Sequence, residues 1–206
     1  MTVEIKNEIL YVLLPDFASH EMVYLMEAVS SDEMQLKSNP KYVNKIVAPT
    51  LEAVTAIGGF RVLPDYSIEN MPEDYAALVL IGGYGWLTPV ADKVTPIVRK
   101  ALDKGIIVGA ICNGASFMAK QGFLNGVKHT GNGLEQLQLW GAENYTNSEG
   151  YIHEQAVSDG NIVTANGSGV LEFTKELLLL LENDTPERIE MYYQFNKQGF
   201  CALFPK

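Results

Sequence analysis

Short runs of apolar residues alternate along the chain with longer stretches in which apolar residues recur every three or four positions. The short runs predict buried strands, because a strand covered on both faces shows no polar side. Strands of this kind that alternate with amphipathic helices predict an α/β fold with a mainly parallel sheet. The strand predictions rest on residues 9–14, 76–81 and 106–111.

Helices are predicted between these strands from apolar spacing and from the residues at their ends. Ser19 is a suitable N-cap for a helix over residues 19–29. The apolar residues from Val94 to Leu102 form a stripe with helical spacing that ends before Gly105. Further helices are predicted at residues 114–122, 134–137 and 170–181, and one is predicted to begin at Pro186.

Two antiparallel pairs are predicted from their turn residues. The Gly-Gly pair that separates residues 54–57 from residues 60–63 predicts a hairpin between these two segments. Residues 150–152 are predicted to pair with residues 161–165 across a Ser-Asp-Gly turn.

Cys112 lies where the apolar run of residues 106–111 meets the next helix. A side chain at such a corner is displayed at the end of the sheet, and small neighbours such as Ala110 and Gly114 let the backbone turn sharply. The N–H groups and the positive dipole end of the helix favour a thiolate over a thiol. Many cysteines pack as small inert residues, but this corner, followed by Asn113, favours a reactive thiol.

The composition predicts one core and a reducing compartment. The chain has 206 residues, of which 47% are hydrophobic and 19% charged, enough for a single domain over residues 1–206. Its two cysteines, Cys112 and Cys201, form no disulfide framework, and Cys201 lacks a corner and is predicted to be inert. No metal or nucleotide motif is present, so we expect no cofactor and no metal site.

Charge and hydropathy restrict the partners that we expect. A formal net charge of −10 argues against nucleic acid, because binding to a polyanion rests on Lys and Arg. The apolar run at Leu177–Leu181 is too short to cross a bilayer, and Met1 to Lys6 show no signal peptide. These features predict a cytoplasmic protein without a nucleic-acid or membrane partner.

Several motifs, in a consistent order, carry a resemblance to a known family. The segment Ala-Ile-Cys-Asn-Gly around Cys112 resembles the cysteine elbow of the DJ-1/PfpI family, within the class I glutamine amidotransferase-like superfamily. Residues 80–83 resemble the family's glycine loop, residues 14–21 its glutamate corner, and residues 159–165 its late Asp-Gly-Asn strand. The resemblance implies a flavodoxin-like three-layer sandwich with a mainly parallel central sheet, and a homodimer or larger homo-oligomer.

The resemblance also implies roles for individual residues. Cys112 is the reactive centre, and Glu21 aligns with the family's glutamate that approaches the sulfur. A buried carboxyl beside a thiolate has a raised pKa, so Glu21 is expected to stay protonated and tune Cys112. Alternatively, Glu21 is an ordinary acid in the first turn of a helix. The backbone N–H groups of Gly83 and Asn113 are expected to bind a developing oxyanion, although glycine pairs often serve only as turns.

The departures from the family pattern concern proton transfer. Peptidase-like members carry His after the nucleophile, where this chain has Asn113, which does not transfer protons at neutral pH. Amidotransferases use a late His-x-Glu motif, and His153 is instead followed directly by Glu154. His129 is left as a candidate general base, although a lone His is more often structural. Asn132 stands where relatives place His or Tyr.

Two classes of function remain open from the sequence. In the first, Cys112 is the nucleophile of an enzyme acting on small carbonyl or acyl substrates, with hydrolase, glyoxalase or deglycase chemistry. Proteolysis ranks lower because of Asn113, although a family label of protease would be unsurprising. In the second, the protein is a non-catalytic redox or stress sensor that works through oxidation of Cys112. A holdase or scaffold is a third, plainer possibility.

Overall fold

The computed structural model describes residues 7–30 and 41–203, so the N-terminal segment at residues 1–6 lies outside the described part. Its central sheet has seven strands in the order β5-β2-β1-β6-β7-β9-β8, and only β8 runs antiparallel to its neighbour. These strands are β1 (Asn7–Val12), β2 (Tyr42–Ala48), β5 (Tyr66–Ser67), β6 (Ala77–Leu80), β7 (Ile107–Ile111), β8 (Ala156–Asp159) and β9 (Ile162–Ala165). The mainly parallel α/β prediction is confirmed.

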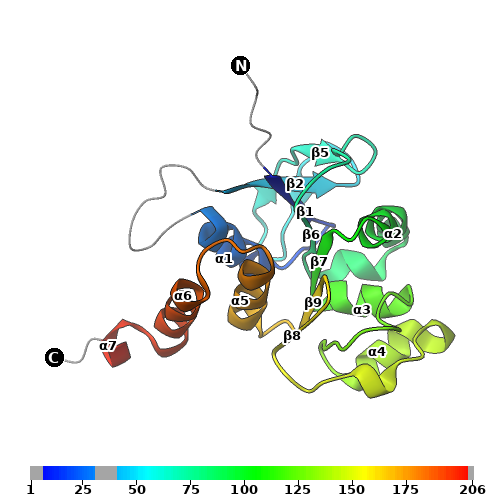
Figure 1. Cartoon of the computed structure of the whole chain (residues 1–206). Coiled ribbons are helices and arrows are strands. Elements are labelled where there is room, and N and C mark those ends of the chain that lie inside the picture. Colours follow the sequence, from blue (N-terminus) through cyan, green and yellow to red (C-terminus); the bar gives the residue numbers. More distant parts are fainter. Residues whose placement is uncertain (1–6, 31–40, 204–206) are drawn as a thin grey trace.

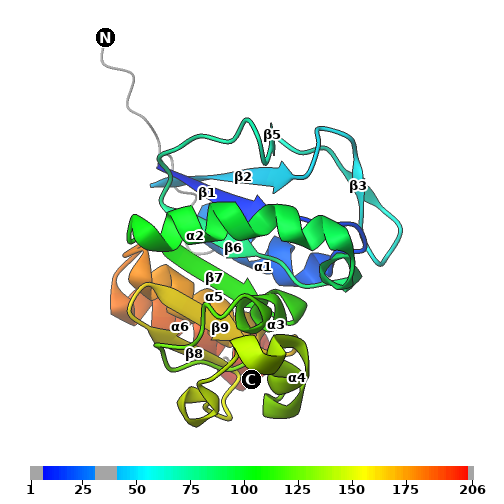
Figure 2. The ribbon, with the colours of Figure 1, turned by 90° about the vertical axis from the view of Figure 1, so that its right-hand side faces the viewer.

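Helices cover both faces of the sheet, which makes the three layers of a flavodoxin-like sandwich (Figure 1). Helices α1, α5 and α6 lie on one face, and α2, α3 and α4 lie on the other. Figure 2 shows α2 and α3 in front of the sheet when that second face is turned to the viewer. Their bounds are α1 (Ser19–Ser30), α2 (Thr95–Asp103), α3 (Asn113–Lys120), α4 (Leu134–Gly141), α5 (Val170–Leu180), α6 (Pro186–Gln198) and α7 (Phe200–Leu203).

The apolar runs form central strands because both of their faces are buried. In β1, Ile9 and Tyr11 enter the core under α1 and α5, while Leu10 and Val12 enter the core under α2 and α3. This alternation follows from the two-residue period of a strand. Each fully buried aliphatic side chain contributes about 1.5–3 kcal/mol, so these strands anchor both layers.

One of the two predicted antiparallel pairs is confirmed, and the other is not. The predicted hairpin forms a small separate sheet of β3 (Val54–Thr55) and β4 (Arg61–Val62). The pairing of residues 150–152 with β9 is wrong: β8 is the antiparallel partner of β9, and Tyr151 forms an isolated bridge with His129. The tight turn at Gly160, with φ of 55°, pairs β9 with the residues immediately before that turn.

Short 3₁₀ helices connect some of the main elements. The segments η1 (Tyr84–Leu87) and η2 (Pro89–Val94) lie between β6 and α2, and η3 (Ala142–Asn144) and η4 (Ser148–Gly150) follow α4. Within the described residues, no helix is both long and apolar enough to span a membrane. The parallel strands β1, β6, β7 and β9 end at a common edge, where an open α/β sheet places its ligands.

Candidate active site

Cys112 occupies a strained corner between β7 and α3. Its φ of 57° and ψ of −124° lie in a region that L residues rarely adopt, at a cost of about 1–3 kcal/mol. Its N–H donates to the Ala165 carbonyl of β9 at 2.9 Å, which fixes the corner to the sheet. A Cβ on Gly114 would lie 2.6 Å from the Leu80 carbonyl oxygen, so α3 approaches the sheet closely there. The predicted elbow is present.

The sulfur of Cys112 is surrounded by polar groups from four segments. The Glu21 carboxyl contacts it from α1, and the backbone N–H of Asn113 donates to it. The Asn132 Nδ2 atom, just before α4, donates to Sγ at 3.3 Å. A Cβ on Gly167 would lie 3.1 Å from Sγ and 3.4 Å from the Glu21 Oε1 atom, so the two reactive atoms face this glycine together.

Glu21 is held in the site by the glycine loop that follows β6. Its side chain is 1% exposed, and its Oε2 atom accepts the Gly82 N–H at 2.8 Å. A Cβ on Gly82 would lie 2.5 Å from Oε2 and 2.6 Å from the Cys112 Cβ. The backbone of Gly82 therefore packs directly against both the carboxyl and the cysteine, and a residue with a side chain would not fit there.

Burial raises the pKa of both the Glu21 carboxyl and the Cys112 thiol. Burial raises the pKa of Glu21, although the Gly82 N–H partly lowers it. Burial and then the charge of Glu21 raise the pKa of Cys112, and the donors on Asn132 and Asn113 lower it by less. The predicted preference for a thiolate is therefore wrong in its net direction, because the thiol is more buried than a surface elbow would be.

Gly83 lies beside the elbow, and the Phe17 bridge leaves its own backbone polar groups unused. It forms an antiparallel bridge with Phe17, in which Tyr84 N–H donates to the Asp16 carbonyl and Ala18 N–H donates to the Gly82 carbonyl. This is the non-hydrogen-bonded kind of pair, whose own N–H and C=O groups point away from the partner strand. The Gly83 carbonyl accepts the Asn113 Nδ2 atom at 2.9 Å. No described residue accepts the Gly83 N–H, so that donor is free for a ligand.

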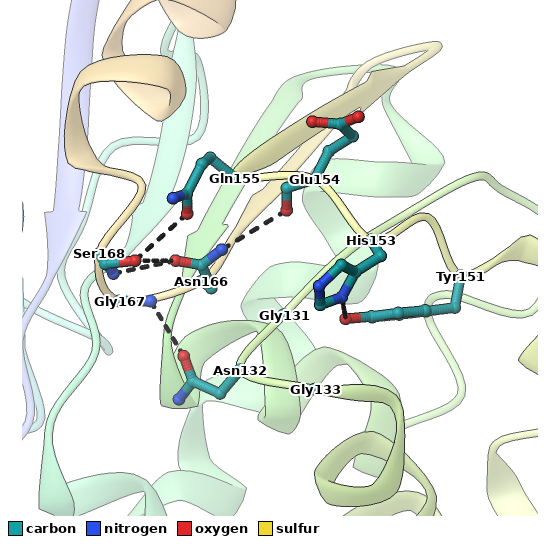
Figure 3. A pocket seen from close by; sticks show the side chains of 10 residues that line it. All are labelled: Gly131, Asn132, Gly133, Tyr151, His153, Glu154, Gln155, Asn166, Gly167 and Ser168. Atoms are coloured by element: carbon teal, nitrogen blue, oxygen red, sulfur yellow. Dashed lines mark hydrogen bonds between the residues drawn. The ribbon is translucent and has the colours of Figure 1, made fainter. Parts of the chain in front are cut away.

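A polar hollow of about 670 Å³ opens beside the sulfur, lined by residues of the segments 131–133, 151–155 and 166–168. Asn132 belongs both to this hollow and to the sulfur site, because its Oδ1 atom accepts the Gly167 N–H at 2.9 Å while its Nδ2 reaches Sγ. Figure 3 shows Gln155, Asn166 and Ser168 meeting on one side of the hollow, with His153 and Tyr151 on the other. Such a lining suits a neutral, hydrogen-bonding group.

His129 is not placed to serve Cys112 as a base. The residue is fully buried, its Nδ1 lies 2.8 Å from the Val127 carbonyl oxygen, and its Nε2 lies 2.6 Å from the Tyr145 hydroxyl. Burial lowers the pKa of His129, which keeps its ring neutral in the interior. Both ring nitrogens are occupied away from the sulfur, so the expectation that His129 reaches back to Cys112 is corrected. Asn132 contacts the sulfur instead.

The other singled-out residues lie farther from the reaction centre. His153 lines the hollow and contacts the Tyr151 hydroxyl at 3.3 Å, and the Glu154 carboxylate points away from the hollow (Figure 3). Cys201 is exposed on the short helix α7. The sequence analysis missed Gly167 and His20, whose Nε2 lies 3.5 Å from the Gly167 carbonyl oxygen. The position of Gly167 could have identified it, since residues 166–169 follow a strand that ends at the same sheet edge.

A cysteine at a strand-to-helix corner, facing a buried glutamate across a glycine loop, defines a class of elbow-cysteine α/β proteins. The sequence profile described as DJ-1/PfpI family matches residues 7–180. The chain therefore belongs to the DJ-1/PfpI family.

Individual relatives agree with this assignment. The chain is 36% identical to "Uncharacterized protease YdeA" from Bacillus subtilis, over 96% of this chain and 94% of that protein. It is 29% identical to "Deglycase TK1284" from Thermococcus kodakarensis, over 62% of this chain and 76% of that protein.

Solved structures show the same fold. A DJ-1 superfamily protein from Agrobacterium tumefaciens superposes with a TM-score of 0.82 at 32% identity, covering 93% of this chain and 98% of that one. A thiJ/pfpI family protein from Bacillus anthracis gives a TM-score of 0.84 at 30% identity, covering 96% and 92%.

The Glu21→Gln substitution tests the coupling of the carboxyl to the thiol. Gln keeps the size of the side chain and a hydrogen-bond donor but carries no charge, so the pKa of Cys112 should fall. A titration of the thiolate ultraviolet absorbance in a Cys201→Ser background measures this pKa. A Cys112 pKa that stays the same or rises would show that the Glu21 charge does not act on the sulfur.

The same variant should change the pH dependence of stability. A raised pKa of Glu21 means that the folded protein binds this proton more tightly than the unfolded chain, so stability falls as pH rises through the folded-state pKa. Glu21→Gln removes that loss. We expect the variant to melt higher than wild type at neutral pH, by roughly 2–4 °C for each kcal/mol regained. The difference should vanish near about pH 4, where the carboxyl is protonated in both states.

Proposed function

We propose that the protein is a cysteine-dependent enzyme acting on small carbonyl or acyl substrates. The observation that carries this proposal is the free N–H of Gly83, a residue hydrogen-bonded to Asn113 next to the corner where the Cys112 sulfur meets the buried Glu21 carboxyl. A preorganised donor of this kind is useful for a negative charge that develops on oxygen during attack on a carbonyl. A structural cysteine has no use for it.

The proposed reaction begins when a carbonyl compound enters beside Asn132. The Cys112 sulfur bonds to the carbonyl carbon, its proton passes to the Glu21 carboxylate, and the electron pair of the C=O bond moves onto oxygen. The N–H groups of Gly83 and Asn113 donate to that oxygen. Glu21 then returns the proton, either to the oxygen of an adduct or to the leaving group of an acyl substrate. One shared proton thus serves both directions of transfer.

The site favours small substrates over peptide bonds. Amine leaving groups need a strong proton donor, and the position after the nucleophile carries Asn113, whose amide is already used at both ends. The printed names of the relatives include both a protease and a deglycase. We propose carbonyl or activated acyl chemistry of the glyoxalase, deglycase or esterase type, with proteolysis as a weaker activity.

One observation also favours a redox role as the second candidate. The sulfur is partly exposed, and it has hydrogen-bond donors from Asn132 and Asn113 beside the Glu21 carboxyl. Oxidation by successive peroxide molecules to a sulfinate would add oxygens that these groups can bind. The redox sensor therefore shares its residues with the enzyme and differs from it only in whether substrate turns over.

A substrate panel tests the proposed function. We expect methylglyoxal, glycated amino acids or p-nitrophenyl acetate to turn over with the untreated protein, and model peptides to turn over more slowly. Protein alkylated at Cys112, checked by peptide mass spectrometry, should be inactive with each compound. If none of these compounds turns over while peroxide is consumed stoichiometrically at Cys112, the sensor is the better assignment.

A further inference from the structure

A chain of two side-chain amides connects α4 to the glycine loop. The Gln136 Nε2 atom donates to the Asn113 Oδ1 atom at 3.0 Å, and the Asn113 Nδ2 atom donates to the Gly83 carbonyl at 2.9 Å. Asn113 is buried, and Gln136 is half-buried. This chain of hydrogen bonds ends on Gly83, the residue with the free N–H beside the elbow. Among the described residues, Gln136 itself makes no hydrogen bond to Cys112.

The chemistry of the groups fixes the direction of this chain. The Gly83 carbonyl only accepts, so Asn113 must turn its NH₂ end toward it, and this leaves the Oδ1 end in need of a donor. Gln136 supplies that donor. Without Gln136, the Oδ1 atom of Asn113 has no donor and the amide is held at one end only, so its contact with the Gly83 carbonyl is less well fixed.

Gly83 has an unusual backbone conformation, which contacts with its neighbours keep in place. Its φ is 136°, which suits glycine alone, and a Cβ there would lie 2.3 Å from the Asp16 carbonyl oxygen. The Phe17 bridge holds the loop from one side, and the Asn113 amide holds it from the other. An oxyanion donor must be aimed before the reaction if it is to stabilise the transition state, so the second contact bears on the rate.

We propose that Gln136 is a positioning residue for the oxyanion donor, acting through Asn113 on Gly83. This inference rests on the proposed function, because it assigns Gln136 to the oxyanion half of that site. The role belongs to reactions in which charge develops on a carbonyl oxygen. It does not extend to reactions of the sulfur that form no oxyanion.

Two reagents separate these reactions in a Cys201→Ser background. Acylation of Cys112 by p-nitrophenyl acetate develops an oxyanion, whereas alkylation by iodoacetamide displaces iodide at a saturated carbon and develops none. We expect Gln136→Ala to slow acylation about tenfold and to leave the alkylation rate and the pKa of Cys112 unchanged, since the loss of a whole donor costs about 10²–10³. Release of p-nitrophenol and mass spectrometry of the Cys112 peptide give the two rates.

Two further variants sharpen the test. Gln136→Glu keeps the size of the side chain but presents only acceptors, which draws the Asn113 NH₂ away from Gly83, so acylation should be slower than in Gln136→Ala. Gln138→Ala is the matched control, because Gln138 lies on the same helix and donates to Ser148 at 3.1 Å. Gln138→Ala should acylate at the wild-type rate.

The outcomes distinguish the positioning role from the proposed function. If Gln136→Ala acylates as fast as wild type, or if alkylation slows by the same factor, the positioning role is wrong and the enzyme proposal stands. If wild-type Cys112 is alkylated but never acylated, the oxyanion site itself is wrong, and the role of Gln136 is wrong with it.

Discussion

Replacing Cys112 with serine should abolish turnover of the best substrate in the panel, by about 10³-fold or more. A serine hydroxyl is far less acidic than a thiol and needs a base in contact with it. The Glu21 carboxylate, which takes the thiol proton in the proposed reaction, is far too weak a base for a hydroxyl, and the other groups at the sulfur are an amide and backbone N–H groups. The serine should therefore be as inactive as an alanine at the same position.

The comparison of Cys112→Ser with Cys112→Ala makes this prediction specific. Both variants keep the Cα position and its positive φ, so both should fold, which far-ultraviolet circular dichroism and thermal melting would show. Steady-state rates of the two variants should match within error. Serine activity well above that of alanine would mean that a base stronger than the Glu21 carboxylate reaches this corner, and the role of proton acceptor proposed for Glu21 would then be wrong.

The fold was readable from the sequence where burial is uniform. The β1, β6 and β7 runs are apolar without interruption because both faces of each strand are covered, and this pattern alone indicated a parallel sheet. Strand β2 was not assigned, because Asn44 and Lys45 interrupt its apolar pattern. In the structure Asn44 bonds to the Met26 carbonyl and Lys45 pairs with Asp65, so tertiary contacts keep these polar residues in a strand.

The site was readable only as far as it is local in sequence. The Cys112 elbow and the glycine loop are short motifs, and the structure places both at one sheet edge beside Glu21. Gly167 and Gln136 come from segments far along the chain and meet the elbow only once β9 and α4 are in place. Their spacing carries no periodic signal. Only the position of Gly167, just after the predicted strand at residues 161–165, pointed to this sheet edge, and nothing in the sequence connected Gln136 with the sulfur.

Other expectations stay predictions. A homodimer, a cytoplasmic location, a single domain over residues 1–206 and the inertness of Cys201 were inferred from resemblance and composition. Cys201 is exposed, and alkylation that is faster there than at Cys112 would contradict its predicted inertness.

Gly82→Ala should be the most disruptive single-methyl change in the site. The added Cβ would lie 2.5 Å from the Glu21 Oε2 atom, 2.6 Å from the Cys112 Cβ and 3.0 Å from the Ile111 carbonyl oxygen. All three neighbours are buried or tied to the sheet, so the loop itself must move. We expect a loss of about 1–3 kcal/mol in the free energy of unfolding, as for other overpacked interiors.

The larger effect of Gly82→Ala should fall on the chemistry. Displacing the loop separates Glu21 from the sulfur and turns the Gly83 N–H away from the corner, so acylation by p-nitrophenyl acetate should fall about 10²-fold. Because the Glu21 charge then acts less on the sulfur, the pKa of Cys112 should fall while acylation slows. A purely structural effect would lower the stability but would change neither the pKa of Cys112 nor the ratio of the acylation rate to the alkylation rate.

Gly58→Ala is the control for the methyl group itself. Gly58 lies between β3 and β4, and a Cβ there meets nothing within 4 Å. It should melt and acylate as wild type does. The test of Gly82→Ala compares the two glycine variants in three measurements. These are thermal melting, the thiolate titration, and the acylation and alkylation rates of Cys112. If Gly82→Ala also behaved as wild type, the close approach of Glu21 to the elbow could not be what makes Cys112 reactive.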